Sequence, residues 1–318
     1  KNLYHAGLAI WGMGAVFGPI IAPTVGGDLN ELYGWRWVFF LIVPFGFAAI
    51  LAISLIITDK TKNKSIPFDW LGFLSLAVAV AGVQLILDRG ERADWFESTE
   101  IWIESGAVVA AIYFFLVHTL TTDRPFIKPA IFKDRNYTVG MIMIFVFGML
   151  NFVPMVLFPP LLQELRGFPQ SVIGLLLGAR GAGTLTGFLI MAFVTQVNPR
   201  IPVFMGFALQ AFSGFVIAGF SINLTSFDVA WTSYVQGFGV GLVWVPLNVL
   251  AFSTLKQVYV PDAAAILHLI RNMGSSVFIS ICIITIMRTA KITYAGLAET
   301  VSPYNKLFDI PFLMGAWS

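Results

Sequence analysis

Charged residues are the scarcest class in this sequence. They make up 11% of its 318 residues, whereas apolar residues make up 58%, and the mean hydropathy is +0.83. Soluble domains are about one quarter charged, so a soluble globular protein is excluded. The net charge is only +2, and no basic cluster alternates with aromatic residues, so we expect no nucleic-acid partner. The composition predicts an all-α polytopic membrane protein.

Cysteine is almost absent as well. The single cysteine, Cys282, excludes an internal disulfide framework and a metal site built from several cysteines. It lies between Ile281 and Ile283, which favours a small buried apolar role. The sequence also has no phosphate-binding glycine loop, no paired catalytic carboxylates and no zinc-ligand spacing. We therefore expect no metal, no cofactor and no enzymatic activity.

Long apolar runs dominate what is present. A membrane-spanning helix needs about 20 mostly apolar residues, and nine segments meet this requirement. They cover residues 5–27, 35–57, 68–87, 101–120, 137–160, 171–197, 202–222, 229–254 and 263–286. The tail from Met287 to Ser318 contains Pro303 and Pro311, and we predict a long loop there that leads to a further span. Because the chain opens at Lys1 without an initiator methionine, we expect a fragment that lacks both ends.

Lysine and arginine are concentrated in alternate loops. One set of loops contains Lys60, Lys62, Lys64, Arg124, Lys128, Lys133, Arg135, Arg200 and Lys256. The opposite loops contain only Arg36, Arg89, Arg92 and Arg166. Loops rich in lysine and arginine stay in the cytoplasm, so the first segment is predicted to run from inside to outside.

Small residues recur every four positions in the first span, where two prolines also remove backbone donors. The residues concerned are Gly14, Gly18, Pro19, Ala22, Pro23, Gly26 and Gly27. On a helix this spacing makes a smooth groove that a neighbouring backbone can approach closely. Together with the stretch from Gly34 to Pro44, it resembles the antiporter motif of the major facilitator superfamily, in its EmrB/QacA-type branch of fourteen-span exporters. That family usually has glycine at the position of Ala22.

The resemblance continues in the same order along nearly the whole chain. Further matching stretches are 69–72, 87–96, 124–137, 179–183, 236–247 and 271–276. The resemblance implies a partial major facilitator fold that covers about the fifth to the thirteenth span. Residues 1–57 would be the last two helices of the N-terminal bundle, and residues 58–136 an inserted helix pair with a cytoplasmic loop. Residues 137–318 would form the C-terminal bundle without its last helix.

The same resemblance implies a function. It indicates a secondary active multidrug exporter of the bacterial inner (cytoplasmic) membrane, which exchanges small hydrophobic or amphipathic drugs for protons and draws its energy from the proton gradient. Some family members work with a periplasmic membrane-fusion adaptor and an outer-membrane channel. Two alternatives remain open: export of one physiological solute, such as a fatty acid, siderophore or lipid precursor, and a non-transporting membrane scaffold subunit.

Ionisable groups inside a bilayer are costly, so each one is a candidate for function. Arg180 and Arg271 lie deep in their spans, either bonded to backbone carbonyls or lining a central cavity. His268, Arg271 and Asn272 are three or four residues apart and are predicted to share one helix face. His268 is also a candidate proton relay. Gln236 is expected to form interhelical hydrogen bonds or to line the cavity.

No carboxylate lies deep in a predicted span, so we expect the proton-coupling carboxylates outside this chain. Asp28, directly after the glycine pair of the first span, is the one outside candidate here. A second pliable helix is predicted around Gly237, Gly239, Gly241 and Pro246. One enzyme-like spacing occurs, His118 followed by Asp123, but its place at the cytoplasmic end of a span argues against acyl transfer.

Overall fold

The computed structural model describes residues 22–56, 68–123, 125–193, 198–220 and 224–300, to which all structural statements refer. These residues form helices and connecting loops, without a strand among them. Eight of the helices are long and apolar enough to cross a bilayer, and they match the second to the ninth predicted span. Of the first predicted span, only the end lies within the described residues, in a helix over residues 22–33. The predicted all-α polytopic fold is confirmed.

The helices follow one another with short connections. They are α2 (Trp35–Ile56), α3 (Trp70–Arg89), α4 (Thr99–Thr121), α5 (Arg135–Arg166), α6 (Gln170–Phe193), α7 (Arg200–Ala218), α8 (Ser226–Phe252) and α9 (Val260–Thr300). Three short 3₁₀ helices, η1 (Trp95–Glu97), η2 (Pro129–Lys133) and η3 (Gln257–Tyr259), lie in the loops before α4, α5 and α9. Extramembrane mass is therefore small in the described chain.

Polar residues at the span ends determine where several helices begin. The carboxylate of Asp69 accepts the backbone N–H of Gly72 at the start of α3, and Asp134 accepts that of Tyr137 at the start of α5. Thr225 and Asp228 form a reciprocal capping box at the start of α8. These bonds satisfy backbone donors that a helix leaves unpaired at its N-terminus.

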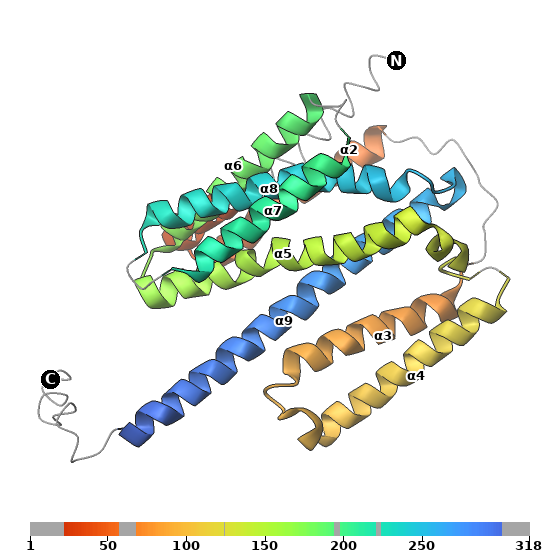
Figure 1. The fold of residues 1–318 in the computed structure, drawn as a ribbon, viewed down its shortest axis with the longest axis horizontal. Coiled ribbons are helices and arrows are strands. Elements are labelled where there is room, and N and C mark those ends of the chain that lie inside the picture. Colours follow the sequence, from red (N-terminus) through yellow and green to blue (C-terminus); the bar gives the residue numbers. More distant parts are fainter. Residues whose placement is uncertain (1–21, 57–67, 124, 194–197, 221–223, 301–318) are drawn as a thin grey trace, which may run out of the picture.

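Two helix pairs form the centre of the molecule, α6 with α8 and α5 with α9, while α7 packs on the outside of α8 (Figure 1). One apolar core joins α5, α8 and α9, and within it the buried Tyr137 hydroxyl donates to the Ala263 carbonyl at 2.8 Å. A second core lies where the end of α5 meets α6 and α8. The antiparallel pair α3 and α4 lies beside α9.

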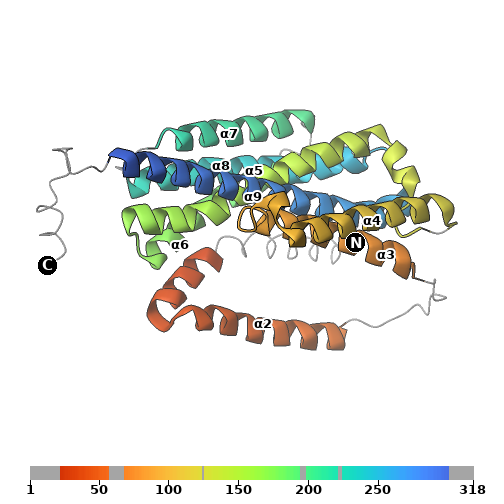
Figure 2. The same cartoon turned by 90° about the horizontal axis from the view of Figure 1, so that it is seen from below.

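Helix α2 stands apart from the other helices (Figure 2) and contains no buried residue, although it is strongly apolar. Phe45 is 69% exposed and Leu55 is 80% exposed. In water such a surface would aggregate, but in a bilayer lipid tails are a suitable neighbour for it. The exposed apolar side chains of α2 therefore agree with a membrane-spanning role.

The predicted loop after Met287 is wrong for its first part. Helix α9 continues without a break to Thr300 and is 41 residues long. The prolines that suggested a loop begin only at Pro303, and charged residues before it form ion pairs on the helix surface. Arg288 and Lys291 lie 3.1 and 3.6 Å from the two carboxylate oxygens of Glu91. The residues from 301 onward lie outside the described part.

Candidate functional site

Arg180 lies inside α6 with only 8% of its surface exposed. Its Nη2 donates to the backbone oxygen of Asn151 on α5 at 2.5 Å and to the Asn151 side-chain oxygen at 2.6 Å. Within the described residues no carboxylate pairs with this guanidinium, and its Nε has no partner. Burying a charge costs several kcal/mol unless it is paired. Two bonds to neutral oxygens offset part of that cost and leave a net positive charge inside the bundle.

Beside this arginine, the backbones of α8 and α6 are in direct contact at glycine residues. A methyl group at Gly237 would overlap the carbonyl oxygen of Arg180, and one at Gly183 would overlap that of Tyr234. Gln236, which precedes Gly237, is only 4% exposed, and its Oε1 finds no donor among the described residues. The glycine contact thus brings a second buried and unpaired polar atom to the level of Arg180.

Arg271 on α9 lies between aromatic rings from two other helices. Its guanidinium carbon is 5.0 Å from the ring centre of Trp244 on α8 and 5.7 Å from that of Phe152 on α5. Its Nε is buried and has no partner within the described chain. A cation over an aromatic face gains about 0.5 to 2 kcal/mol, more as water is excluded. The arrangement keeps a partly desolvated cation between α5, α8 and α9.

His268 and Asn272, which were predicted to share a helix face with Arg271, contact different parts of the protein. The His268 ring lies 5.9 Å from that of Trp244 and so joins the aromatic group around Arg271. Asn272 lines a cavity on the side of α3, although its Oδ1 still accepts from Nη2 of Arg271 at 3.3 Å. His268 and Arg271 are therefore brought together as expected, whereas Asn272 connects them to a different surface. The proton-relay role of His268 stays a prediction.

The end of the antiporter motif packs against the beginning of α6. A methyl group at Gly27 would overlap the Gln170 carbonyl oxygen, and one at Gly174 would overlap the Pro23 carbonyl oxygen. Ala22 and Gly26 lie on the same short helix, while Gly14, Gly18 and Pro19 lie outside the described residues. The described half of the motif thus serves close helix contact, as its spacing predicts. Asp28 follows on the exposed side of this helix and forms no ion pair within the described chain.

The glycines of α8 face two neighbours. Gly237 and Gly241 contact α6, whereas Gly239 faces the Gly206 carbonyl oxygen of α7. Pro246 lies further along the same continuous helix and is buried. In this structure the glycine run allows α8 to pack closely between α6 and α7. Bending of α8 during a transport cycle stays a prediction.

An arrangement that the sequence did not suggest lies where α3 begins and α4 ends, on the side that the charge pattern predicts to be cytoplasmic. One oxygen of Asp69 lies 2.8 Å from Nε2 of His118, and the other accepts the backbone N–H of Phe126 at 2.8 Å. Burial acts to raise the pKa of Asp69, but the hydrogen bonds from Gly72, His118 and Phe126 outweigh it and hold that pKa below its ordinary value. His118 therefore pairs with Asp69, and the enzyme-like spacing to Asp123 has no counterpart in these contacts.

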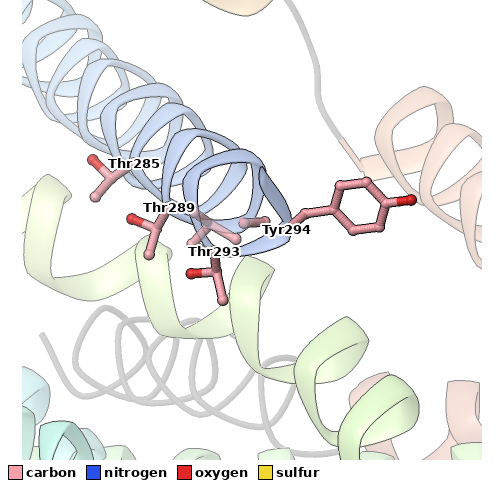
Figure 3. Close-up of a pocket in the computed structure, with 6 residues that line it drawn as sticks. Thr285, Thr289, Thr293 and Tyr294 are labelled. Carbon is pink, nitrogen blue, oxygen red and sulfur yellow. The ribbon is translucent and has the colours of Figure 1, made fainter. Parts of the chain in front are cut away.

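The C-terminal part of α9 carries a shallow surface depression of about 610 Å³. Figure 3 shows Thr285, Thr289 and Thr293 in a row along the helix, with Tyr294 directed away from them. All of the lining residues belong to α9 alone. A surface made by one helix does not enclose a ligand, so this depression is not a candidate site.

The sequence profile of the Major Facilitator Superfamily matches residues 4–279. The chain belongs to this superfamily. Buried polar side chains on α6, α7, α8 and α9 within an otherwise apolar bundle agree with that membership, which indicates a transporter rather than an enzyme.

Similar superfamily members include EmrB-type export proteins. The chain is 31% identical to the multidrug export protein EmrB of Escherichia coli over 301 residues, which cover 94% of this chain and 59% of that protein. It is 28% identical to the fatty acid resistance protein FarB of Neisseria gonorrhoeae over 94% of the chain and 59% of FarB. Against the lincomycin resistance protein LmrB of Listeria monocytogenes, identity is 25% over 92% of the chain and 62% of LmrB. The chain thus spans about three fifths of the length of these superfamily members.

Proposed function

We propose that this chain belongs to a secondary active exporter of hydrophobic or amphipathic drugs that exchanges them for protons across the bacterial inner membrane. Support comes from the superfamily membership and from relatives whose names refer to multidrug export, fatty acid resistance and lincomycin resistance. The observation that carries the proposal is the placement of Arg271 between the rings of Trp244 and Phe152.

Such a group of side chains suits substrates that combine a flat apolar body with an electron-rich or anionic part. The apolar body would stack on Trp244 or Phe152, while the anionic part would meet the Nε of Arg271, which has no acceptor within the described chain. Arg180 supplies a second positive charge on α6. Few fixed hydrogen bonds are involved, which favours tolerance of different substrates over selection of one.

Proton coupling requires a group that gains and loses a proton during the cycle. In the described residues, carboxylates occur only near the ends of the spans and in the loops. We infer that the coupling carboxylates belong to parts of the protein outside this chain, and Asp28 and His268 are the candidates within it. A periplasmic membrane-fusion adaptor and an outer-membrane channel are further proposed partners.

The test is efflux from energised bacterial cells that express the full-length gene. Ethidium serves as a cationic probe and a dansyl-labelled carboxylate as an anionic probe, each with and without a protonophore. We expect protonophore-sensitive efflux of both. We expect Arg271→Ala to slow carboxylate efflux about tenfold, because about 1.4 kcal/mol of stabilisation is lost, with a smaller effect on ethidium. Arg288→Ala, at matched membrane abundance, is the control and should retain both activities.

The outcomes separate the alternatives. Efflux of the carboxylate probe without any efflux of ethidium would favour an exporter of one physiological solute. Absence of efflux for both probes, with normal membrane abundance, would favour a non-transporting scaffold. Efflux that persists with the protonophore would contradict proton exchange.

A further inference from the structure

A cavity of about 510 Å³ lies between α3 and α9, and we call it the α3–α9 cavity; Asn272, which lines it, accepts a hydrogen bond from Arg271, whereas Arg271 itself is not among the lining residues. Figure 1 shows α3 running beside α9 along this stretch. Ala77 and Ala81 form its wall on α3, and Leu269 and Met273 form the wall on α9. The two small alanines leave the space, because larger side chains at their positions would fill it.

Both ends of the cavity are closed by contacts within the chain. At the outer end, the Asp88 carboxylate accepts the Ser280 hydroxyl at 3.0 Å and the Gln84 amide at 2.9 Å, which joins α3 to α9. At the cytoplasmic end, Phe126 and Ile127 of the loop before α5 form the floor. The cavity therefore opens sideways between the two helices, toward the position of lipid tails.

Its length matches one leaflet of a bilayer. The lining residues on α3 extend from Phe73 to Gln84, which is about 16 Å along a helix with 1.5 Å rise per residue. The hydrocarbon core is about 30 Å thick, so one leaflet contributes about 15 Å. Because Phe73 lies one turn from the start of α3 and Gln84 lies beyond its midpoint, the cavity begins near that membrane surface and reaches past the middle of the span. Its walls are almost entirely apolar, with Gln84 and Asn272 among the few polar side chains.

A positive charge lies at the cytoplasmic end. Lys128 directly follows the floor residue Ile127, and its side chain is 43% exposed. Its Nζ lies 3.1 Å from an Asp262 oxygen and 5.5 Å from the ring centre of Tyr259. An ammonium has three donors, so Lys128 can bind a phosphate oxygen while it keeps Asp262. Basic groups between helices on the cytoplasmic side attract anionic lipid head groups.

We propose that the α3–α9 cavity binds one acyl chain of an anionic phospholipid from the cytoplasmic leaflet, with the lipid phosphate at Lys128. The bound chain fills the space between α3 and α9 and so joins the α3–α4 pair to the bundle. Binding is measured without any transport step, and the inference does not depend on which substrate the protein exports.

Native mass spectrometry of the purified full-length protein tests this proposal with phosphatidylglycerol and phosphatidylethanolamine of equal chain length. We expect phosphatidylglycerol to be retained about fivefold better, which corresponds to about 1 kcal/mol for one lysine near the surface. Ala81→Trp should abolish this retention by filling the cavity, whereas Val78→Trp, on the exposed side of α3, should not. Lys128→Gln should remove the preference for phosphatidylglycerol, and the exposed Lys133→Gln should keep it.

A second measurement avoids the question of whether a variant folds. Phosphatidylglycerol with a diazirine in the middle of one acyl chain is photolysed with the wild-type protein in vesicles, and labelled peptides are identified. Labelling concentrated at residues around Ala81 and Leu269 supports the proposal. Uniform labelling of all lipid-facing helices, or unchanged lipid retention in Ala81→Trp, would overturn it. Photolabelling at these residues that a drug prevents but unlabelled lipid does not would also overturn it. So would an absence of labelling because another helix of the complete protein covers the cavity.

Discussion

The carboxylate of Asp69 lies 2.8 Å from Nε2 of His118, although 49 residues separate them in the chain. The same carboxylate caps α3 and accepts the backbone N–H of Phe126, so one side chain joins the start of α3, the end of α4 and the loop before α5. Asp69 therefore holds the start of α3, the end of α4 and the loop before α5 together at one polar point.

Replacing Asp69 should loosen all three contacts together. We expect Asp69→Asn to lower the free energy of unfolding by about 1 to 2 kcal/mol, because a helix cap and a charge-assisted hydrogen bond are weakened. Thermal unfolding of the purified full-length protein in detergent measures the change. Asp123→Asn is the matched control. An equal loss of unfolding free energy in that variant would contradict a specific stabilising role for Asp69.

The same carboxylate predicts a dependence on pH. Because the pKa of Asp69 lies below its ordinary value of 3.8, the folded state binds this proton less readily than the unfolded chain does. The stabilisation is therefore complete above the unfolded pKa and is lost as pH falls through the folded pKa. The measurement compares the unfolding temperatures of His118→Gln proteins with and without the additional change Asp69→Asn. Their difference should stay constant above about pH 5 and shrink below about pH 4. A difference that grows on acidification would disprove this role.

The contact between Gly237 and the Arg180 carbonyl predicts that no side chain larger than hydrogen fits at position 237. Gly237→Ala places a methyl group where the Arg180 backbone already lies, so α6 and α8 must separate, at a cost of about 1 to 3 kcal/mol. Gly214→Ala on α7 meets no atom within 4 Å and is the control; its higher helix propensity should stabilise the protein by up to about 1 kcal/mol. Fluorescence-detected size-exclusion chromatography after heating compares the two variants. Equal heat stability of the two variants would contradict the close contact between α6 and α8 at Gly237.

The loop between α3 and α4 should hold the C-terminal part of α9 in place. Glu91 accepts the Trp95 indole N–H at 3.1 Å and pairs with Arg288 and Lys291. We expect Glu91→Gln to speed amide hydrogen exchange between residues 285 and 294, because the loop then binds this stretch less strongly. Glu97→Gln, which changes an exposed carboxylate without an ion pair in the described chain, should leave exchange unaltered. Exchange unaffected by either change would show that the ion pairs do not restrain α9.

Membrane orientation can be tested with single cysteines. After Cys282→Ser removes the one native thiol, Arg92→Cys should react with a membrane-impermeant maleimide on intact cells, because its loop is predicted to face outward. Lys133→Cys should react only after the membrane is opened. The reverse pattern would invert the predicted topology.

The apolar runs were sufficient to predict the helices, because a bilayer requires each spanning segment to satisfy its own backbone hydrogen bonds. The motif glycines also predicted close packing, which Gly27 and Gly174 display. Helix ends were harder: α5 continues through Pro159 and Pro160 to Arg166, and α9 continues beyond Met287. Prolines suggested that these helices end earlier, but α5 accommodates its prolines, and α9 is held by ion pairs to Glu91 before Pro303 is reached.

Partners of polar residues could not be predicted from the sequence. The depth of Arg180 was evident, but its bond to Asn151 depends on how α5 and α6 are placed side by side. Likewise, helical spacing grouped Asn272 with His268, while the position of α3 determines what Asn272 faces. Trp244 and Phe152 gave no signal in the sequence, since aromatic residues are abundant throughout the chain.

The length of α9 gives it mechanical leverage. With 41 residues, it extends about 60 Å, twice the thickness of the hydrocarbon core. Lys291 lies 20 residues, or about 30 Å, beyond Arg271 along this helix, so a tilt of about 10° about Arg271 moves Lys291 by about 5 Å. A small tilt around Arg271 is therefore amplified along α9 toward the point where Glu91 contacts the helix.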